Sequence, residues 1–436
     1  MNGSSAEASS PPPRDDSCRQ QAGTEKKETR GGRDAQHGQT IRGATDTACG
    51  PPRCPLQRNH LRGARGLEAA AILAFVKAQP LSRPAIIPGD SFRFLVDDEL
   101  SRFVIEEGRE IASFAPEALV LIDEIASLLG AGGKRLRPVF CYWGHRAGGG
   151  TDGPELVRAA AAIELLHTSA IIHDDLMDRS KLRRGRPAAF RTLGGEGPAA
   201  ERHGLSSAIL AGDLAQALAD RLLARSGFPP DRVLAAFEHF NRMRVQAVSG
   251  EFLDLLSALR GEAGEDEARR TAALKSGSYT VVGPLLVGAS LAGASTPVME
   301  SLERYGRPLG EAFQLRDDIL GTFGDPDVTG KDRDTDIREG KQTTLLAKAR
   351  QSASPQLRRL LAGGVGRPGL TTEEVDVVRE GIRDGGALAQ TIALIDSLAV
   401  QAKAELATLE SPRAFFGQEV AGALEAMAGL VVLRDA

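Results

Sequence analysis

The chain has 436 residues, with 54 Lys and Arg against 58 Asp and Glu and a formal net charge of -4. This near-neutral balance argues against nucleic acid as a main partner, since no excess of positive charge is present to neutralise phosphates. The four cysteines show no zinc-binding spacing, which favours a reduced, cytoplasmic protein without a disulfide framework. The N-terminus lacks the apolar core of a secretory signal. The uncharged segment Val281–Met299 is diluted by Gly, Pro and Ala, so we expect a buried core helix there and no transmembrane segment.

Residues 1–88 are predicted to form a disordered or weakly structured N-terminal extension. Up to about residue 66 the chain is rich in Gly, Pro, Arg and Ser, and it cannot bury enough apolar surface to offset its chain entropy. A short apolar helix candidate, Leu67–Val76, and a proline-punctuated linker, Pro80–Pro88, follow. A targeting tail and non-native sequence from an upstream start codon stay open as alternatives.

Residues 89–436 are predicted to form a single all-α domain, a large helical bundle. Apolar residues recur at three- and four-residue spacing, Gly, Pro and Asp turns separate the runs, and β-branched alternation is absent. The predicted helices are Ser91–Glu107, Ala115–Leu129, Leu136–Arg146, Pro154–Met177, Ala199–Ala224, Pro230–Leu259, Glu267–Leu274, Val281–Ala292, Val298–Phe323, Thr343–Arg350, Gln356–Ala362, Thr372–Asp384, Ala387–Thr408 and one near the C-terminus.

The strongest chemical signal is an acidic triplet, Asp174, Asp175 and Asp178, at the end of the helix predicted for Pro154–Met177. Asp174 and Asp178 lie one helical turn apart, so their carboxylates share a face and repel each other unless a cation lies between them. Hard oxygen ligands suit Mg²⁺, which takes its other ligands from water and substrate phosphates. A solvated acidic helix end is the alternative, and it fits poorly because the helix leading into the triplet is apolar.

A second acidic pair, Asp317 and Asp318, lies near the end of the helix predicted for Val298–Phe323. Two acidic segments that face each other across a bundle can clamp one polyanion through several metal ions. Two chance occurrences on apolar helices would be a rare coincidence. The pair therefore strengthens the prediction of a metal site.

Two basic clusters complete the pattern, Gly132–Pro138 (GGKRLRP) and Arg183–Pro187 (RRGRP). Helix starts favour anions, and guanidinium groups pair bidentately with phosphate oxygens. Taken alone, either cluster could be surface charge or a nucleic-acid contact. Acidic sites and separate cations beside an apolar interior together indicate a ligand with a diphosphate head and a hydrocarbon tail. The loop Asp325–Lys341, rich in Gly and Asp, is predicted to act as a lid.

These motifs resemble those of the trans-isoprenyl diphosphate synthases, the polyprenyl synthetase family, and most of all geranylgeranyl and farnesyl diphosphate synthases of bacterial type. The matching segments, in family order, are GGKRLRP, ELLHTSAIIHDDLMD, RRGRP, LAGD, FQLRDDILG, GDPDVTGKD and REGKQT. The resemblance implies an all-α bundle of the isoprenoid synthase type with a central cavity. It also implies a homodimer that condenses isopentenyl diphosphate head-to-tail with dimethylallyl, geranyl or farnesyl diphosphate.

The resemblance implies a role for each acidic residue. Asp174 and Asp178 are expected to hold two of three Mg²⁺ ions, with Mn²⁺ as a possible substitute, and Asp317 is expected to hold the third. Asp175 flanks the first motif. Lys275 joins these aspartates in the expected catalytic set.

The resemblance also divides the remaining polar residues between two diphosphates. The allylic diphosphate is expected to be gripped by Arg183, Lys275, Lys331 and Lys341, at a site that Gln314 lines. The diphosphate of isopentenyl diphosphate is expected to be held by Lys134, Arg137, His167 and Arg184. The allylic C–O bond then ionises, the alkene attacks the cation, and a proton is lost to the departing diphosphate.

Product length is expected to depend on the face of the helix below the first motif. Ser169 and Ala170 are small, and Leu166 lies deeper along the same face. Without an aromatic floor on this helix, a product longer than farnesyl is favoured, and we expect geranylgeranyl diphosphate. Two positions depart from the family pattern: Gly321 replaces a third Asp in the second motif, and Glu251 stands where many members have Gln. No role is assigned to Glu251.

Two other functions compete with this interpretation. A class I terpene cyclase uses the same ionisation, but it needs no pocket for isopentenyl diphosphate. A non-catalytic subunit of a heteromeric synthase would usually lack aspartates, whereas both acidic motifs are intact here.

Overall fold

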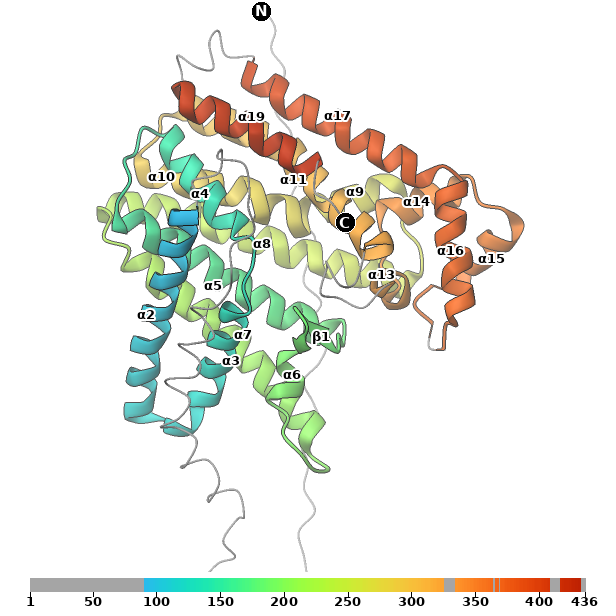
Figure 1. The fold of residues 1–436 in the computed structure, drawn as a ribbon, viewed down its shortest axis with the longest axis horizontal. Coiled ribbons are helices and arrows are strands. Elements are labelled where there is room, and N and C mark those ends of the chain that lie inside the picture. Colours follow the sequence, from blue (N-terminus) through green and yellow to red (C-terminus); the bar gives the residue numbers. More distant parts are fainter. Residues whose placement is uncertain (1–89, 325–333, 364, 368, 408–415, 433–436) are drawn as a thin grey trace, which may run out of the picture. The chain divides into compact units, whose positions relative to one another are not determined.

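The computed structural model describes residues 90–324, 334–363, 365–367, 369–407 and 416–432 (Figure 1). The predicted N-terminal extension, with Leu67–Val76 and Pro80–Pro88, lies outside the described residues. The domain boundary after residue 88 therefore stays a prediction. Most of the predicted lid, residues 325–333, also lies outside them.

Helices make up nearly all of the described chain (Figure 1), which confirms the predicted all-α fold. In chain order they are α2 Asp90–Phe114, η2 Pro116–Ala118, α3 Leu119–Gly130, α4 Leu136–Ala147, α5 Pro154–Met177, α6 Ala189–Thr192, α7 Ala200–Ala224, α8 Pro230–Arg260, α9 Glu265–Ala272, η3 Ala273–Val282, α10 Gly283–Ala292, α11 Thr296–Phe323, α13 Thr335–Glu339, α14 Thr344–Gln351, α15 Pro355–Gly363, α16 Thr372–Asp384, α17 Ala387–Ala407 and α19 Gln418–Val432.

Two helices have the bounds that the sequence predicts, α5 and α16. Helix α5 begins with Pro154, whose missing N–H costs nothing in the first turn. Helix α16 begins with a capping box in which Thr371 and Glu374 satisfy each other's backbone N–H groups. These starting signals are local, so they can be recognised in the sequence.

Helix α5 is the central helix and packs against α7, α2 and α4. Its residues Ala159–Ala162 have no exposed surface, as expected for a helix that is apolar on every side. Among the described helices, α5 has the length and apolar composition needed to cross a membrane, and 72% of its most apolar window is buried inside the protein. The predicted core helix in Val281–Met299 is confirmed, because α10 is buried from Gly283 to Leu291.

The π-helix η3 was not predicted, since the sequence analysis placed a break between Leu274 and Val281. It packs against α11 with almost no space between the two backbones. A Cβ atom at Gly310 would lie 2.6 Å from the carbonyl oxygen of Gly277. Only glycine permits this approach, which brings η3 close to the helix that carries the second acidic motif.

A smaller hydrophobic cluster lies beside the main core and includes Ile337, Val375 and Ile382 from α13 and α16. Phe323 and Leu388 pack against both clusters and join them. The sequence analysis also missed two short elements near the site. One is α13, and the other is a hairpin in which β1 (Leu182–Arg183) pairs with β2 (Arg186–Pro187).

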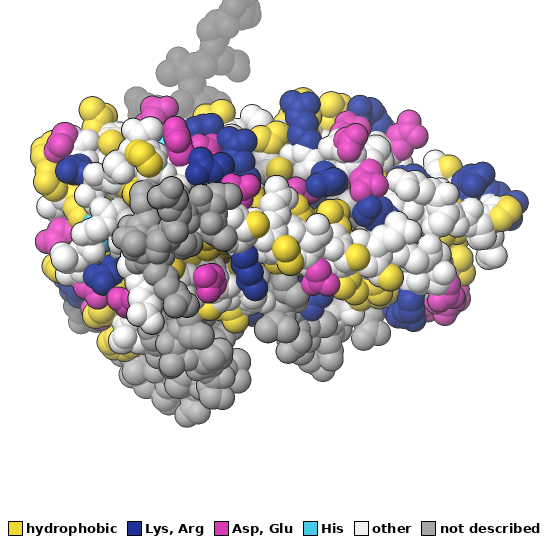
Figure 2. Space-filling view, turned by 90° about the horizontal axis from the view of Figure 1, so that it is seen from above, with side chains coloured by type: hydrophobic (Ala, Val, Ile, Leu, Met, Phe, Trp, Pro, Cys, Tyr) yellow, Lys and Arg dark blue, Asp and Glu magenta, His cyan; other side chains and the backbone are white. Residues whose placement is uncertain are grey.

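Figure 2 shows one face of the molecule, on which acidic and basic side chains are interspersed and apolar side chains are scattered between them. No segregated basic surface is visible among the described residues on this face.

Candidate active site

One large cavity, of about 1210 Å³, lies inside the bundle. Asp174 on α5 and Asp317 on α11 both line it, so the fold brings the two acidic motifs to one hollow. Asp175 and Asp178 are not among the lining side chains, and Lys331 lies outside the described residues. The other predicted site residues that line the cavity are Lys134, Arg137, Leu166, His167, Ser169, Ala170, Arg183, Arg184, Lys275, Gln314 and Lys341.

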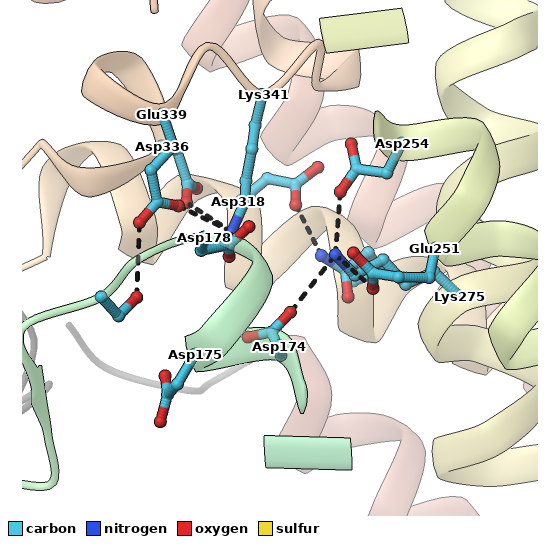
Figure 3. Close-up of polar contacts among 12 residues, drawn as sticks. Asp174, Asp175, Asp178, Glu251, Asp254, Lys275, Asp318, Asp336, Glu339 and Lys341 are labelled. Atoms are coloured by element: carbon cyan, nitrogen blue, oxygen red, sulfur yellow. Dashed lines mark hydrogen bonds and ion pairs between the residues drawn. The ribbon is translucent and has the colours of Figure 1, made fainter. Parts of the chain in front are cut away.

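Two lysines at the acidic end of the cavity are each surrounded by carboxylates (Figure 3). The Nζ atom of Lys275 lies 2.8 Å from Glu251, 2.8 Å from Asp254 and 3.5 Å from Asp174. Burial opposes the charged form of this ammonium group, but the carboxylates outweigh it and raise its pKa. Lys275 is therefore a fixed positive charge beside the first acidic motif.

Lys341 has a similar acidic environment, next to Asp178, Asp336 and Glu339 (Figure 3). Its Nζ atom lies 2.7 Å from Asp178, 2.9 Å from Glu339 and 4.0 Å from Asp336. Burial again opposes the charge, and the surrounding carboxylates raise the pKa well above its usual value. Burial is also the main cause that raises the pKa of Glu339 to about 7, against the effect of Lys341.

Asp175 does not point toward the two lysines (Figure 3). Its side chain is 1% exposed and accepts a 2.7 Å hydrogen bond from Nε of Arg183. The Nη2 atom of the same arginine donates to Asp174 at 3.0 Å. The two aspartates outweigh the effect of burial and raise the pKa of Arg183. Asp175 thus fixes the arginine that the hairpin presents to the cavity.

Among the described residues, the carboxylates at this end outnumber the cations. The carboxylates are Asp174, Asp175, Asp178, Glu251, Asp254, Asp317, Asp318, Asp336 and Glu339, and the cations are Arg183, Lys275 and Lys341. Burial, followed by the charge of Asp336, raises the pKa of Asp318 well above its usual value, although Gln314 donates to it at 2.7 Å. Such a cluster of hard oxygen donors favours a divalent cation.

Within the described residues, no three His, Cys, Asp or Glu side chains already converge as a closed metal site. Lysine and arginine hold several of the carboxylate oxygens instead. An open arrangement, in which the protein supplies a few carboxylates and the substrate supplies further oxygens, is the one that suits Mg²⁺. The donor set therefore fits magnesium better than a structural zinc.

The other end of the cavity is basic. Arg137 lies 4.6 Å from the centre of the Tyr279 ring and donates to Thr280 at 2.8 Å. The Nδ1 atom of His167 lies 3.0 Å from the hydroxyl of Tyr279. His167 can be reached from the cavity but lies deep in the bundle, so burial, and then Arg137 and Arg184, lower its pKa well below the usual value. This histidine is neutral at pH 7.

The sequence model of the polyprenyl synthetase family matches residues 120–380. This chain belongs to the polyprenyl synthetase family. It is 36% identical over 255 residues to the geranylgeranyl diphosphate synthase of Sulfolobus acidocaldarius, a match that covers 57% of this chain and 72% of that protein. It is 32% identical over 293 residues to the nonaprenyl diphosphate synthase of Mycobacterium tuberculosis, covering 66% and 81%.

Solved structures of polyprenyl synthetases show the same fold. The geranylgeranyl pyrophosphate synthase of Corynebacterium glutamicum, complexed with isoprenyl diphosphate and magnesium, superposes with a TM-score of 0.72 at 34% identity. That match covers 79% of this chain and 99% of the other. The family and the isoprenoid synthase fold that the motifs predict are both confirmed.

One residue of the basic end escaped the sequence analysis, Arg135. It has a left-handed backbone conformation, with φ of 48°, at the start of α4. Its side chain, 2% exposed, donates to Asp97 at 2.7 Å and to Glu164 at 2.5 Å. It also donates to the carbonyl oxygen of Leu129 at 2.7 Å. Arg135 therefore fixes the polyprenyl synthetase motif GGKRLRP to α2, α3 and α5, and Glu164 serves as its structural partner on α5.

Arg184 is fixed from the other side of the same glycine turn. Its guanidinium donates to the carbonyl oxygens of Leu128, at 3.1 Å, and Gly132. A Cβ atom on Gly133 would lie 3.2 Å from the guanidinium of Arg184 and 3.3 Å from that of Arg135. The two arginines therefore enclose this turn, and a larger residue would push them apart.

The cavity wall below the first motif matches only part of the prediction for chain length. Ser169, Ala170 and Leu166 all line the cavity, as a polyprenyl synthetase needs for an apolar chain. Aromatic side chains also line it, from helices other than α5, which the prediction of chain length did not consider. They are Phe252 on α8, Tyr279 on η3 and Phe313 on α11.

Proposed function

We propose that this polyprenyl synthetase condenses isopentenyl diphosphate head-to-tail with an allylic diphosphate, in the presence of Mg²⁺, to give a trans-polyprenyl diphosphate. One observation carries the proposal. A single cavity of about 1210 Å³ holds an acidic end, a basic end and an apolar wall between α5 and α8. A reaction that joins two diphosphate esters through their hydrocarbon parts needs all three.

The acidic end is proposed as the site of the allylic diphosphate. Magnesium, which Asp174, Asp178 and Asp317 would hold, supplies positive charge for the leaving diphosphate. Lys275, Lys341 and Arg183 are held as fixed cations within 3.5 Å of one or more of the aspartates, so they can stabilise the same developing charge without rearrangement. Gln314 is held by Asp318 at the edge of this end.

The basic end is proposed as the site of isopentenyl diphosphate. Lys134, Arg137 and Arg184 supply its positive charge, and neutral His167 can donate or accept a hydrogen bond. With the two diphosphates at opposite ends of the cavity, the hydrocarbon parts of the substrates extend toward each other. The alkene of isopentenyl diphosphate then lies next to the ionising carbon and can attack it. The proton that is then lost goes to the departing diphosphate, and the apolar wall keeps water from the cation.

Geranylgeranyl diphosphate is the proposed product. The small residues Ser169 and Ala170 leave space for a growing chain, while Phe252 on the opposite wall limits it. We expect Ser169→Phe to shorten the main product, because the added ring would fill the cavity directly below Asp174. Chromatography of the dephosphorylated products measures this, with Ser169→Ala as the size-matched control. An unchanged product profile in Ser169→Phe would contradict the assignment.

A homodimer in the cytoplasm is also proposed. Apolar side chains are exposed on α7 and α8, and those on α8 recur at three- and four-residue spacing, as one helix stripe does. They are Ile209, Leu210, Val245, Val248, Phe252, Leu255 and Leu259. A second copy that covered this stripe would remove it from water.

The activity is tested by incubating the purified full-length chain with isopentenyl diphosphate and, in turn, dimethylallyl, geranyl and farnesyl diphosphate. Elongated products that require Mg²⁺ and disappear with a chelator support the proposal. A cyclised hydrocarbon formed without isopentenyl diphosphate would instead identify a terpene cyclase. No product under any of these conditions would favour a non-catalytic subunit.

A further inference from the structure

Gly321 is the position at which the second acidic motif lacks a third aspartate. It lies on α11 one helical turn after Asp317, so it belongs to the same face of that helix. A Cβ atom on Gly321 would lie 2.0 Å from Oδ2 and 2.6 Å from Cγ of Asp336. Contacts below 3.0 Å are essentially never seen for real Cβ atoms, so any other residue at 321 would displace that carboxylate.

Asp336 comes from α13, the short helix that the sequence analysis did not predict. Its side chain is 14% exposed and lies 4.0 Å from Nζ of Lys341, which in turn contacts Asp178 at 2.7 Å. Asp336, Gly321 and Asp317 all line the same cavity. The carboxylate of Asp336 therefore lies between the two acidic motifs, on the face of α11 from which a third aspartate of the second motif would project.

We propose that Asp336 supplies the carboxylate that Gly321 lacks, so that the second acidic motif is completed from a separate helix. This rests on the proposed function, because it assigns Asp336 to the same magnesium and diphosphate site. Asp336 is a positioning residue: together with Asp178 it orients Lys341, and it adds an oxygen donor near Asp317. The glycine at 321 is the other half of the arrangement, since it leaves the space that the carboxylate fills.

A merely structural carboxylate at the start of α13 would behave differently. An acidic side chain in a first helical turn stabilises the helix through its dipole. Its removal would lower the unfolding temperature equally with and without Mg²⁺. The magnesium dependence of ligand binding therefore separates the two roles.

The experiment measures the thermal unfolding midpoint of the full-length chain at a fixed concentration of inorganic diphosphate while Mg²⁺ is titrated. In Asp336→Asn we expect the half-saturating Mg²⁺ concentration to rise about tenfold, the usual effect of losing a residue that orients metal ligands. The matched control is Asp384→Asn, because Asp384 is an exposed residue of α16 outside the cavity lining. The half-saturating Mg²⁺ concentration of this variant should stay at the wild-type value.

A relocated carboxylate gives the second arm of the test. Gly321→Asp alone should also raise the half-saturating Mg²⁺ concentration, because the new Cβ atom and carboxylate compete with Asp336 for one space. In the double variant Gly321→Asp, Asp336→Ala, one carboxylate again occupies that space. Its half-saturating Mg²⁺ concentration should therefore be at least about threefold lower than that of Asp336→Ala alone.

Two results would overturn the inference. One is a half-saturating Mg²⁺ concentration in Asp336→Asn within about twofold of the wild type. The other is a double variant no better than Asp336→Ala. A wild-type chain that shows no Mg²⁺-dependent shift with diphosphate would contradict the proposed function itself. A normal wild-type shift that Asp336→Asn leaves unchanged would contradict only the role of Asp336.

Discussion

The two ends of the cavity differ in how each can bind a diphosphate. At the acidic end, carboxylates of α5, α8 and α13 and of Asp178, at the end of α5, surround Lys275 and Lys341. At the basic end, Arg137 and Arg184 are bound to a hydroxyl and to carbonyl oxygens. A diphosphate is repelled at the first end unless divalent cations accompany it, whereas the protein's own cations suffice at the second. The comparison predicts that magnesium controls one substrate and not the other.

Asp174→Asn should give the largest effect and sharpen this comparison most. It removes a charge that lies 3.0 Å from Arg183 and 3.5 Å from Lys275. We expect kcat/KM to fall about 10²- to 10³-fold, as when a preorganised electrostatic group is lost. The affinity for isopentenyl diphosphate, measured by calorimetry without the allylic substrate, should stay within about twofold of the wild type.

Asp384→Asn is the control for the loss of a carboxylate and should change neither quantity. If Asp174→Asn weakened isopentenyl diphosphate binding as much as it lowered kcat/KM, the two ends would not be independent. The comparison would then fail at its first test.

Arg137→Gln tests the basic end. The variant removes the guanidinium that lies over the Tyr279 ring but keeps a hydrogen-bonding side chain. We expect KM for isopentenyl diphosphate to rise about 10- to 100-fold, the range for a lost charged hydrogen bond. The half-saturating Mg²⁺ concentration should not change. A shift in the magnesium dependence of this variant would mean that the metal also serves the basic end.

The sequence predicted well what neighbouring residues determine. The apolar periodicity and starting residues gave α5 and α16 with the observed bounds, and both acidic motifs lie on one cavity. It missed what depends on contacts between distant segments. The π-helix η3 relies on the close approach of Gly277 to Gly310, and Arg135 is recognisable as a structural residue only once Asp97 and Glu164 lie beside it.

Glu251 shows the same limit at the acidic end. The family resemblance implies a glutamine at this position, and the sequence has an acid there, but neither indicates what the acid contacts. In the structure its carboxylate lies 2.8 Å from Nζ of Lys275. If the allylic diphosphate binds at Lys275, as proposed, Glu251 competes with it for that ammonium group.

Glu251→Gln should have a smaller effect, of the opposite sign. Removing this negative charge frees Lys275 for the substrate, so we expect KM for the allylic diphosphate to fall about threefold, or ~0.7 kcal/mol. Steady-state kinetics at saturating Mg²⁺ measure this, and KM for isopentenyl diphosphate serves as the internal control. An increase in the allylic KM would show that Glu251 assists binding at the acidic end.

The last effect concerns His167 and is on the pH dependence of stability, not on activity. Burial and the nearby arginines Arg137 and Arg184 lower the pKa of this histidine in the folded chain, whereas in the unfolded chain it is about 6.5. The unfolded state then binds the proton more readily, so stability is lost as the pH falls below about 6.5 and is retained above it.

His167→Gln, which cannot be protonated, should lose about 1 kcal/mol less stability than the wild type between pH 7 and pH 5. Urea unfolding at the two pH values measures the difference, and other histidines cancel because they are present in both proteins. Equal losses in the two proteins would mean that His167 has the same pKa in the folded and unfolded chains, so that it gains its charge at the basic end below about pH 6.5.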